Sequence, residues 1–267
     1  MVIAQPDEAL RQAVSSTSWY HTLELAPGVT THGWFDTRRV PPMLSFPATL
    51  AGRRCLDIAT FDGFWAFEME RRGASEVIAI DVPDPAQWDW PINSPPTVVE
   101  EISQRRPGSG FEIAHRTLQS KVRRLELSVY DLDPARVGTF DFVYLGSLLL
   151  HLRDPVRALE KVRSVCRGDL MVVDAVDIAL SMLSPRRPLA ELDGRGRPWW
   201  WKPNLAGLKR LVEAANFTTT DGPRLLWMPP GPDQVKVRSP RALLTPAGRQ
   251  AALSTWKGDP HAVLRAR

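Results

Sequence analysis

The stretch Arg54–Asp81, RCLDIATFDGFWAFEMERRGASEVIAID, decides the fold of this chain. Cys55–Ala59 is a short apolar run, typical of a buried parallel strand, and Phe64–Arg72 has the length and mixed polarity of a following helix. Val77–Ile80 predicts a second buried strand, so we expect Asp81 at its carboxyl end, where open α/β sheets bind ligands. This order predicts the cofactor-binding half of a nucleotide-type α/β fold.

The turn between the first strand and the helix departs from a dinucleotide-binding turn. Of the glycines in a G-x-G-x-x-G pattern only Gly63 is present, after the side chains of residues 59–62. A pyrophosphate needs several close backbone approaches at a helix N-terminus, which these side chains hinder. This disfavours a nicotinamide-dependent oxidoreductase. Asp62 is expected to cap the helix and Gly73 to end it, while a carboxylate at Asp81 can accept both hydroxyl hydrogens of a ribose.

The segment D-I-A-T-F-D-G-F resembles the first motif of class I S-adenosylmethionine-dependent methyltransferases, D-x-G-x-G-x-G, with Ala59 and Phe61 departing from it. Three later segments fit the same family in order: Leu125–Tyr130 with Asp131, Phe140–Leu145 with its loop, and Arg167–Asp174. The resemblance implies S-adenosylmethionine as cofactor, which carries no phosphate and tolerates the one-glycine turn. It implies these cofactor-binding residues: Asp57, Ala59, Thr60, Phe61, Gly63, Asp81, Val82, Tyr130, Asp131, Gly146 and Ser147.

A narrower resemblance spans roughly His32 to Phe217. LGSLLLHLRDP is similar to the L-x-x-L-Y-H-x-x-x-P stretch of the tRNA wobble-uridine hydroxyl (carboxy)methyltransferase family, and WWWKPNLAGLKRLVEAANF and THGWFDTRRVPPMLSFPATLAGRRCLDI also follow that family's pattern. There, a carboxylated cofactor is associated with a Lys before the first strand and with the Tyr of L-Y-H. Here no Lys or Arg lies between Arg11 and Arg38, and Leu150 takes the Tyr position. Because a carboxylate would lose its charge-assisted partner, plain S-adenosylmethionine is expected.

The expected fold is α/β, a Rossmann-like class I methyltransferase with a mostly parallel seven-stranded sheet and helices on both faces. Residues 1–47 are expected to form an N-terminal helical and aromatic lid, residues 48–240 the methyltransferase domain with an insertion at about 175–203, and residues 241–267 a C-terminal tail. Segments 218–220, 224–227 and 235–237 are strand-like, and the resemblance to this class implies two closing antiparallel strands.

Three histidines are candidates for catalysis. Methyl transfer from a sulfonium is an in-line displacement, so the enzyme holds the nucleophile near the methyl carbon and removes a proton from a hydroxyl acceptor. His151 follows the fourth predicted strand and is the best candidate base, although it could equally pack against the sheet edge. His21 and His32 lie in the aromatic N-terminal segment and are further candidates.

Aromatic side chains suggest a substrate site. Trp19, Tyr20 and Trp34 could fold over the cleft and exclude water, or could pack in the core. Three consecutive tryptophans, 199–201, cannot all face one core, so at least one ring is expected at a cleft or exposed, unless they anchor the insertion. Lys202 and Asn204 begin the next helix, where Asn204 could simply be the N-cap. The substrate-binding residues expected are Trp19, Tyr20, Trp34, Trp200, Trp201, Lys202 and Asn204.

Composition limits the class of protein further. The 267 residues carry a net charge of +4, with basic residues scattered in pairs, whereas a nucleic-acid surface usually has a concentrated stripe. Cys55 and Cys166 provide neither a disulfide framework nor metal spacing. Acidic residues near the fifth strand lack a diagnostic spacing, so no metal is expected: Asp174, Asp177, Glu191 and Asp193. No apolar run approaches the roughly 20 residues of a membrane span, and a cytoplasmic location is expected.

These observations predict O-methylation of a small hydroxylated metabolite, aromatic or sugar-bearing, of the kind made in natural product biosynthesis. Methylation of a tRNA wobble-uridine hydroxyl is the leading alternative, because the narrower resemblance supports it. N-methylation of a small metabolite and cofactor binding without catalysis are further alternatives. No membrane partner is expected, and a homo-oligomer is left open.

Overall fold

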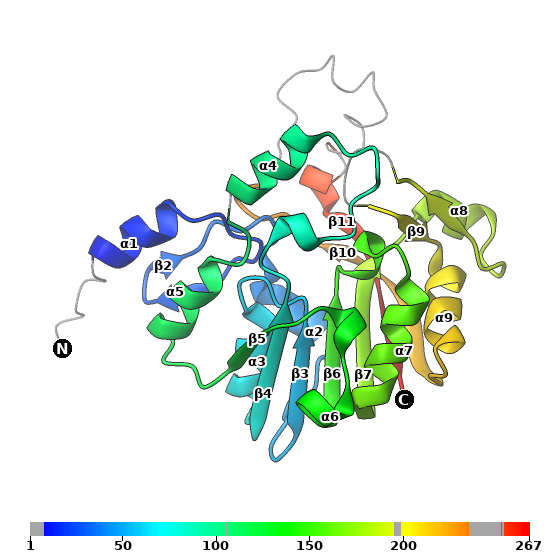
Figure 1. Ribbon diagram of the computed structural model, residues 1–267, viewed down its shortest axis with the longest axis horizontal. Helices are drawn as coiled ribbons and strands as arrows, with labels where there is room; N and C mark the ends of the chain where they lie inside the picture. The colour runs from blue at the N-terminus through cyan, green and yellow to red at the C-terminus, as the bar shows by residue number, and fades with distance from the viewer. Residues whose placement is uncertain (1–7, 105, 195–198, 235–251, 253) are drawn as a thin grey trace.

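One seven-stranded sheet organises the chain. The computed structural model describes residues 8–104, 106–194, 199–234, 252 and 254–267. The strand order is β10-β11-β7-β6-β3-β4-β5, parallel from β7 to β5, with β11 antiparallel to both its neighbours (Figure 1). The strands are β3 (Arg54–Ile58), β4 (Glu76–Asp81), β5 (Arg123–Glu126), β6 (Phe140–Gly146), β7 (Cys166–Ala175), β10 (Thr219–Met228) and β11 (Asp259–Ala266). The predicted mostly parallel seven-stranded sheet is confirmed.

Helices cover both faces of this sheet, because each central strand is apolar on both sides. In β3, Leu56 and Ile58 pack toward α7 and α9, while Cys55 packs toward the N-terminal segment and helices α2, α3 and α5. The helices are α1 (Glu8–Ser15), α2 (Val40–Met43), α3 (Phe64–Arg71), α4 (Pro96–Gln104), α5 (Gly110–Thr117), α6 (Pro134–Val137), α7 (Pro155–Val165), α8 (Ile178–Leu183) and α9 (Leu205–Ala214). No helix in the described part of the chain is both long and apolar enough to cross a membrane.

Smaller elements lie around the carboxyl ends of the parallel strands. The hairpins are β1 (Glu24–Ala26) with β2 (Val29–Thr30), and β8 (Ala190–Leu192) with β9 (Trp201–Pro203). Helices α4 and α8 stand beyond this end of the sheet and bury none of their own residues (Figure 1). They form a rim above the strand ends.

The C-terminal region corrects two expectations. Segments 218–220 and 224–227 merge into the single strand β10. Its partner is β11, so the tail expected at 241–267 is wrong for these residues; residues 235–237 lie outside the described part of the chain. The physical reason is the apolar run Ala262–Leu264, which is buried between β10 and β7.

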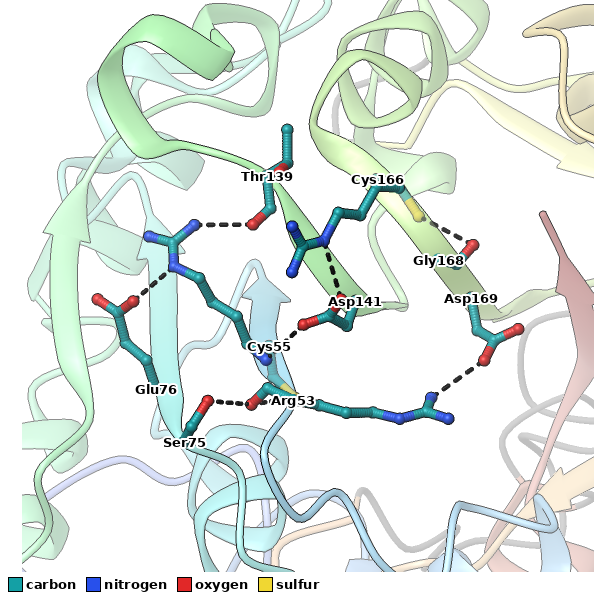
Figure 2. A network of polar contacts seen from close by, with 11 residues as sticks. Arg53, Cys55, Ser75, Glu76, Thr139, Asp141, Cys166, Gly168 and Asp169 are labelled. Carbon is teal, nitrogen blue, oxygen red and sulfur yellow. Dashed lines mark hydrogen bonds and ion pairs between the residues drawn. The ribbon is translucent and has the colours of Figure 1, made fainter.

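Ion pairs hold the amino ends of the strands together (Figure 2). Arg54 donates to Glu76 at 2.5 Å, Arg53 to Asp169 at 3.1 Å, and Arg167 to Asp141 at 2.8 Å. The Arg53–Asp169 and Arg167–Asp141 pairs line an open hollow of about 540 Å³. The guanidinium of Arg167 and the Arg54 backbone N–H hold the pKa of Asp141 below its usual range.

Candidate active site

The turn after β3 takes up backbone conformations that normally require glycine. Ala59 has φ +59°, Phe61 has φ +52° and Gly63 has φ +91°. A non-glycine residue in the left-handed region costs roughly 1–2 kcal/mol. Ala59 and Phe61 stand where the D-x-G-x-G-x-G motif has glycine, so the backbone path of the motif is kept although two of its glycines are not. Strain of this kind concentrates at functional sites.

Gly63 is required by packing as well as by its φ angle. A Cβ placed there would lie 2.5 Å from Phe67 Cε2 and 2.8 Å from Phe111 Cδ2. Gly63 is also the N-cap residue of α3, without a side-chain capping bond, so the expectation that Asp62 caps this helix is wrong. Gly73, with φ +85°, follows the C-cap of the helix, as expected.

Asp62 instead fastens the N-terminal segment to the turn. Its buried carboxylate accepts hydrogen bonds from the backbone N–H of Tyr20 at 2.7 Å and of His21 at 2.9 Å. It also makes a short contact with His21 Nδ1. The competing demand of these three donors explains why Asp62 is turned away from the helix.

Asp57 supports the turn after β3 from within the core. It is buried, and the Thr60 hydroxyl donates to its Oδ2 at 2.7 Å. Burial raises the pKa of Asp57 to about 7, although the Thr60 hydrogen bond opposes the change. Both residues therefore support the backbone around the site from within the core.

Asp81 ends β4 at the carboxyl edge of the sheet, and its contact with a ribose stays a prediction. Its Oδ2 accepts from the Phe61 N–H at 2.7 Å and its Oδ1 from the Val82 N–H at 2.8 Å. Each oxygen can accept a further hydrogen bond. Burial raises the pKa of Asp81, while the Arg124 guanidinium, whose Nη2 lies 3.9 Å from Oδ2, opposes the change. Arg124 also lines an open hollow of about 380 Å³ beside this strand end.

Tyr130 and Asp131 lie in the short turn η3 (Val129–Asp131) after β5. The Tyr130 hydroxyl donates to Asp89 Oδ2 at 2.7 Å and accepts from the Asp154 N–H at 3.1 Å. Tyr130 therefore joins the loop after β4 to the start of α7. Asp131 is exposed at the end of the turn, and its contact with an adenine stays a prediction.

Gly146 ends β6 at the centre of the sheet edge, and Ser147 follows it. A Cβ on Gly146 would lie 2.6 Å from Tyr144 Cε1, so the position requires glycine, and Ser147 has φ +51°. Asp174 holds the following loop by accepting from the N–H groups of Leu148 at 2.9 Å and Leu149 at 2.7 Å. Burial raises the pKa of Asp174 to about 6, against the effect of these hydrogen bonds.

An aromatic cluster covers this edge from the N-terminal segment. The half-buried Tyr20 ring lies 5.3 Å from Phe35, 5.4 Å from Phe61 and 4.8 Å from His21, measured between ring centroids. The His21 ring stacks on Phe64. The N-terminal segment thus reaches the turn after β3 through both Asp62 and aromatic contacts.

The three candidate histidines occupy different places. His21 is buried beside Asp62, and His151 is half-buried at the end of the turn η4 (Leu149–His151) after β6. His32 contacts Asp233 Oδ2 through Nδ1 at 2.6 Å and the Val14 carbonyl through Nε2 at 3.0 Å. Both its ring nitrogens are engaged, so His32 ties the N-terminal segment to Asp233, and its role as a catalytic base stays a prediction.

Two of the expected substrate contacts are structural instead. Trp19 is 3% exposed and packs against Gly110, and its indole N–H donates to the Val14 carbonyl at 3.0 Å. Asn204 is fully buried and is the N-cap of α9, which is the alternative that the sequence also allows. Its amide group accepts from two backbone N–H groups and donates to two carbonyls, which leaves no capacity for a substrate.

Trp200 and Trp201 anchor the β8–β9 hairpin. Trp200 donates its indole N–H to the Asp89 carbonyl at 2.5 Å, and Trp201 donates to the Arg153 carbonyl at 3.1 Å. Trp34 is half-buried and packs with the N-terminal cluster. Contacts of these rings with a substrate stay predictions. A substrate contact of Lys202 stays a prediction as well. The Lys202 ammonium lies close enough to His261 to lower the pKa of that imidazole.

The acidic residues near the end of β7 have backbone partners. Asp174 accepts the hydrogen bonds described above, and Asp177 caps α8 by accepting from the Leu180 N–H at 2.7 Å. In the described part of the chain no three or more His, Cys, Asp or Glu side chains are grouped to hold a metal ion.

The strained turn after β3 and the carboxylate that ends β4 lie where class I S-adenosylmethionine-dependent methyltransferases hold their cofactor, on the sheet that defines this class. The sequence profile of the methyltransferase-domain family matches residues 36–221, more than half of the chain. The chain therefore belongs to this family.

The curated relatives fit the narrower resemblance. A tRNA U34 carboxymethyltransferase of Alcanivorax borkumensis is 28% identical over 187 residues, which cover 67% of this chain and 48% of that protein. The enzyme of the same name from Aeromonas salmonicida is 25% identical over 195 residues, 71% of this chain and 54% of that protein. The chain therefore spans about half the length of the curated relatives it matches.

Solved structures share the fold. The N-terminal domain of EvdMO1 with S-adenosylhomocysteine bound has a TM-score of 0.54 at 15% identity, covering 97% of this chain and 95% of that chain. The [4+2]-cyclase SpnF has a TM-score of 0.50 at 20% identity, covering 97% and 92%. Magnesium protoporphyrin IX methyltransferase from Synechocystis has a TM-score of 0.50 at 14% identity, covering 85% and 79%.

Proposed function

We propose that this methyltransferase acts on a hydroxyl group of a small metabolite, aromatic or sugar-bearing. The observation that supports this best is the rim above the strand ends. Helices α4 and α8 contain no Lys or Arg, α4 carries Glu100 and Glu101, and Met182 and Leu183 of α8 are largely exposed. A phosphate backbone is bound by clustered cations, so an apolar and acidic rim favours a small organic acceptor.

The residues at the strand ends fit the cofactor. Asp81 retains one acceptor position on each oxygen for a ribose diol, and the turn at Ala59–Gly63 brings the backbone close to the strand end. Carboxylates from several segments lie near Tyr20 at this edge, which favours a cation: Asp62, Asp174 and Asp259. When bound, S-adenosylmethionine supplies an electrophilic methyl group on a cationic sulfur.

The protein's part in the reaction is to position, shield and deprotonate. Tyr20 and Phe61 present aromatic surface at the strand ends, and the N-terminal segment that carries Tyr20 acts as a lid that keeps water from the methyl group. A histidine assists removal of the acceptor proton; His151, on the loop after β6, and His21, held by Asp62, are the candidates from the predicted set. The enzyme works as a small-molecule catalyst in the cytoplasm.

A tRNA acceptor is the second candidate, because the relatives named as tRNA U34 carboxymethyltransferases match two thirds of the chain. One neighbour in fold, the EvdMO1 domain, was solved in the presence of S-adenosylhomocysteine and D-fucose, which supports a sugar acceptor instead.

Calorimetric titration with S-adenosylhomocysteine comes first, and micromolar binding is expected. Methyl transfer is then measured with catechol, D-fucose and a tRNA transcript at low and high salt. Turnover of catechol or D-fucose that is insensitive to salt supports the proposal. Turnover of tRNA that falls steeply with salt would replace it by the tRNA function.

A further inference from the structure

Arg124 of β5 places a largely buried guanidinium beside the carboxylate that ends β4. Its side chain is 15% exposed, and its Nη2 lies 3.9 Å from Asp81 Oδ2. In the part of the chain that the structure describes, the Nε and Nη2 atoms of Arg124 are buried and have no hydrogen-bond partner. Buried N–H groups without an acceptor are unfavourable and rare in folded proteins, so two of them on one side chain indicate a role beyond packing.

The neighbours of Arg124 hold its guanidinium at this distance. Its Nη1 donates to the Gly108 carbonyl at 3.2 Å, and its central carbon lies 5.0 Å from the centre of the Phe111 ring. A Cβ on Gly108 would lie 2.7 Å from Arg124 Nη2 and 3.2 Å from the Phe61 carbonyl oxygen. Glycine therefore lets the loop before α5 pack closely against both the guanidinium and the turn after β3.

The gap of 3.9 Å leaves the acceptor positions of Asp81 free. A carboxylate accepts about four hydrogen bonds, and two backbone N–H groups use one position on each oxygen of Asp81. The two positions that are left match the two hydroxyl groups of a ribose. Direct contact with a guanidinium would occupy one of them, as Arg54 does at 2.5 Å on Glu76 at the start of the same strand. Arg124 attracts the negative charge without using an acceptor position.

The charge of Arg124 opposes the effect of burial on Asp81. Burial raises the pKa of Asp81, the Arg124 guanidinium lowers it, and the nearby Asp62 raises it again. Protonation would turn an acceptor oxygen into a donor, which does not fit a ribose hydroxyl that donates. The further charged or titratable groups of the surrounding segments are His21, Asp57, Asp84 and Arg106.

We propose that Arg124 is a positioning residue of the cofactor site, which holds Asp81 as a carboxylate with one free acceptor position on each oxygen. The inference rests on the proposed function, because Asp81 holds a ribose only if S-adenosylmethionine binds at this strand end. It deepens that function by adding to the ribose site a residue of β5 that the sequence motifs do not include. Arg124 acts through Asp81 and does not itself contact the cofactor.

The first test follows the ionisation of Asp81 in the protein without cofactor. Carbon-13 shifts report the charge of each carboxyl group, and an Asp81→Asn variant assigns the signal. Arg124→Gln should move the midpoint of the Asp81 titration to higher pH, because the ionised form loses a neighbouring cation. The matched control is Arg123→Gln, which removes an exposed guanidinium of the same strand that pairs with Glu76, and it should leave the midpoint unchanged. An unchanged midpoint in Arg124→Gln would overturn the proposal.

The second test measures binding of S-adenosylhomocysteine by calorimetry between pH 4 and 8. Arg124→Gln should bind roughly tenfold more weakly than the wild type in the acidic part of this range. The difference should shrink as the pH rises, because Asp81 then ionises in both proteins. Arg124→Lys keeps the charge and should follow the wild-type profile. A loss in Arg124→Gln that is equal at every pH would mean that Arg124 only supports the loop before α5, which contradicts the proposal.

The role of Arg124 and the proposed function fail in different ways. If the wild-type protein does not bind S-adenosylhomocysteine, or if folded Asp81→Asn binds it as the wild type does, the cofactor site is misplaced and the proposed function fails with it. If Asp81→Asn weakens binding and Arg124→Gln does not, only the role of Arg124 is overturned. In the Asp81→Asn background, Arg124→Gln should cause no further pH-dependent loss of affinity.

Discussion

The two ends of the central strands carry carboxylates in contrasting surroundings. Strand β4 begins at Glu76 and ends at Asp81, and β7 carries Asp169 near its start and Asp174 near its end. At the amino ends the partners are guanidinium groups, as Figure 2 shows, and the pKa of each carboxyl is lowered. At the carboxyl ends the partners are mainly backbone N–H groups, and burial raises the pKa.

The difference shows which end of the sheet is suited to a cation. Ion pairs at the amino ends neutralise their own charge, although the larger hollow lies there. Backbone N–H groups stabilise a carboxylate without neutralising it, so negative potential remains at the carboxyl ends. Of the two hollows described, the larger therefore lies at the end where the charges are already paired.

The largest expected effect is on the free energy of unfolding. It is seen by comparing two glycines with positive φ, Gly52 before β3 and Gly63 after it. Gly63→Ala adds left-handed strain and an overlap with Phe67 and Phe111, and should lower the free energy of unfolding by about 2–5 kcal/mol. Gly52→Ala, where no atom lies within 4 Å of the new Cβ, should lower it by about 1–2 kcal/mol. Urea unfolding measures both. Equal losses would mean that the aromatic contacts at Gly63 are not tight.

The next largest expected effect is on cofactor affinity, and it should differ between the two ends of β4. Asp81→Ala should weaken binding of S-adenosylhomocysteine by about 1–3 kcal/mol, because a charged hydrogen-bonded contact to the ribose is lost. Glu76→Ala removes a carboxylate from the other end of the same strand and should leave this affinity unchanged. Calorimetry compares them. If the folded Asp81→Ala protein binds as the wild type does, Asp81 does not hold the cofactor.

The pH dependence of stability should differ between the ends. Asp57 has a pKa of about 7 in the folded protein, above the value near 3.9 when unfolded, so the folded state binds more protons between them. Its contribution to the free energy of unfolding therefore falls as pH rises from about 4 to 7. Asp141, whose pKa is lowered, stabilises the fold above about pH 4 and loses this contribution in acid.

Urea unfolding between pH 3 and 8 tests this contrast. Asp57→Asn should make the decline between pH 4 and 7 shallower, because Asp174, with a pKa of about 6, still contributes to it. Asp141→Asn should differ from the wild type above pH 4 but converge with it in acid. A wild-type pH profile in Asp57→Asn would show that the buried carboxyl does not titrate in this range.

The smallest expected effect is the stability lost when a partly exposed ion pair is broken, because solvent and salt screen such pairs. Asp169→Asn breaks the partly exposed pairs with Arg53 and Arg267, and should cost no more than about 1 kcal/mol, with the difference shrinking in 1 M salt. Asp62→Asn, whose partners are backbone N–H groups and a buried imidazole, should keep its effect in salt. Thermal melts at two salt concentrations compare them, and a salt-resistant loss in Asp169→Asn would contradict the contrast.

The sequence predicts the elements whose signal is local. The apolar runs of β3 and β4, the glycine at position 63 and the carboxylate at 81 lie within 28 residues, and their roles in the fold follow from pattern alone. Asp62 was misassigned because its partner, His21, is 41 positions away and no pattern links them. A local rule for helix capping cannot anticipate such a distant competitor.

His261 escaped prediction for the same reason. The only local signal was the apolar run Ala262–Leu264 next to it, which is short but typical of a strand and could have placed the residue on the sheet. Its contact with Ser147 spans 114 positions. Only the pairing of β11 with β7 brings the two together.

The position of β11 also has a consequence for the kinetics of folding. The segments around Ser147 and His261, which are far apart in the sequence, can meet only after β11 has inserted between β10 and β7. Contacts of such long range are entropically costly to close and tend to slow folding. The parallel core from β3 to β7 can assemble from nearer neighbours, so the last region to become native is the one that would carry out the chemistry.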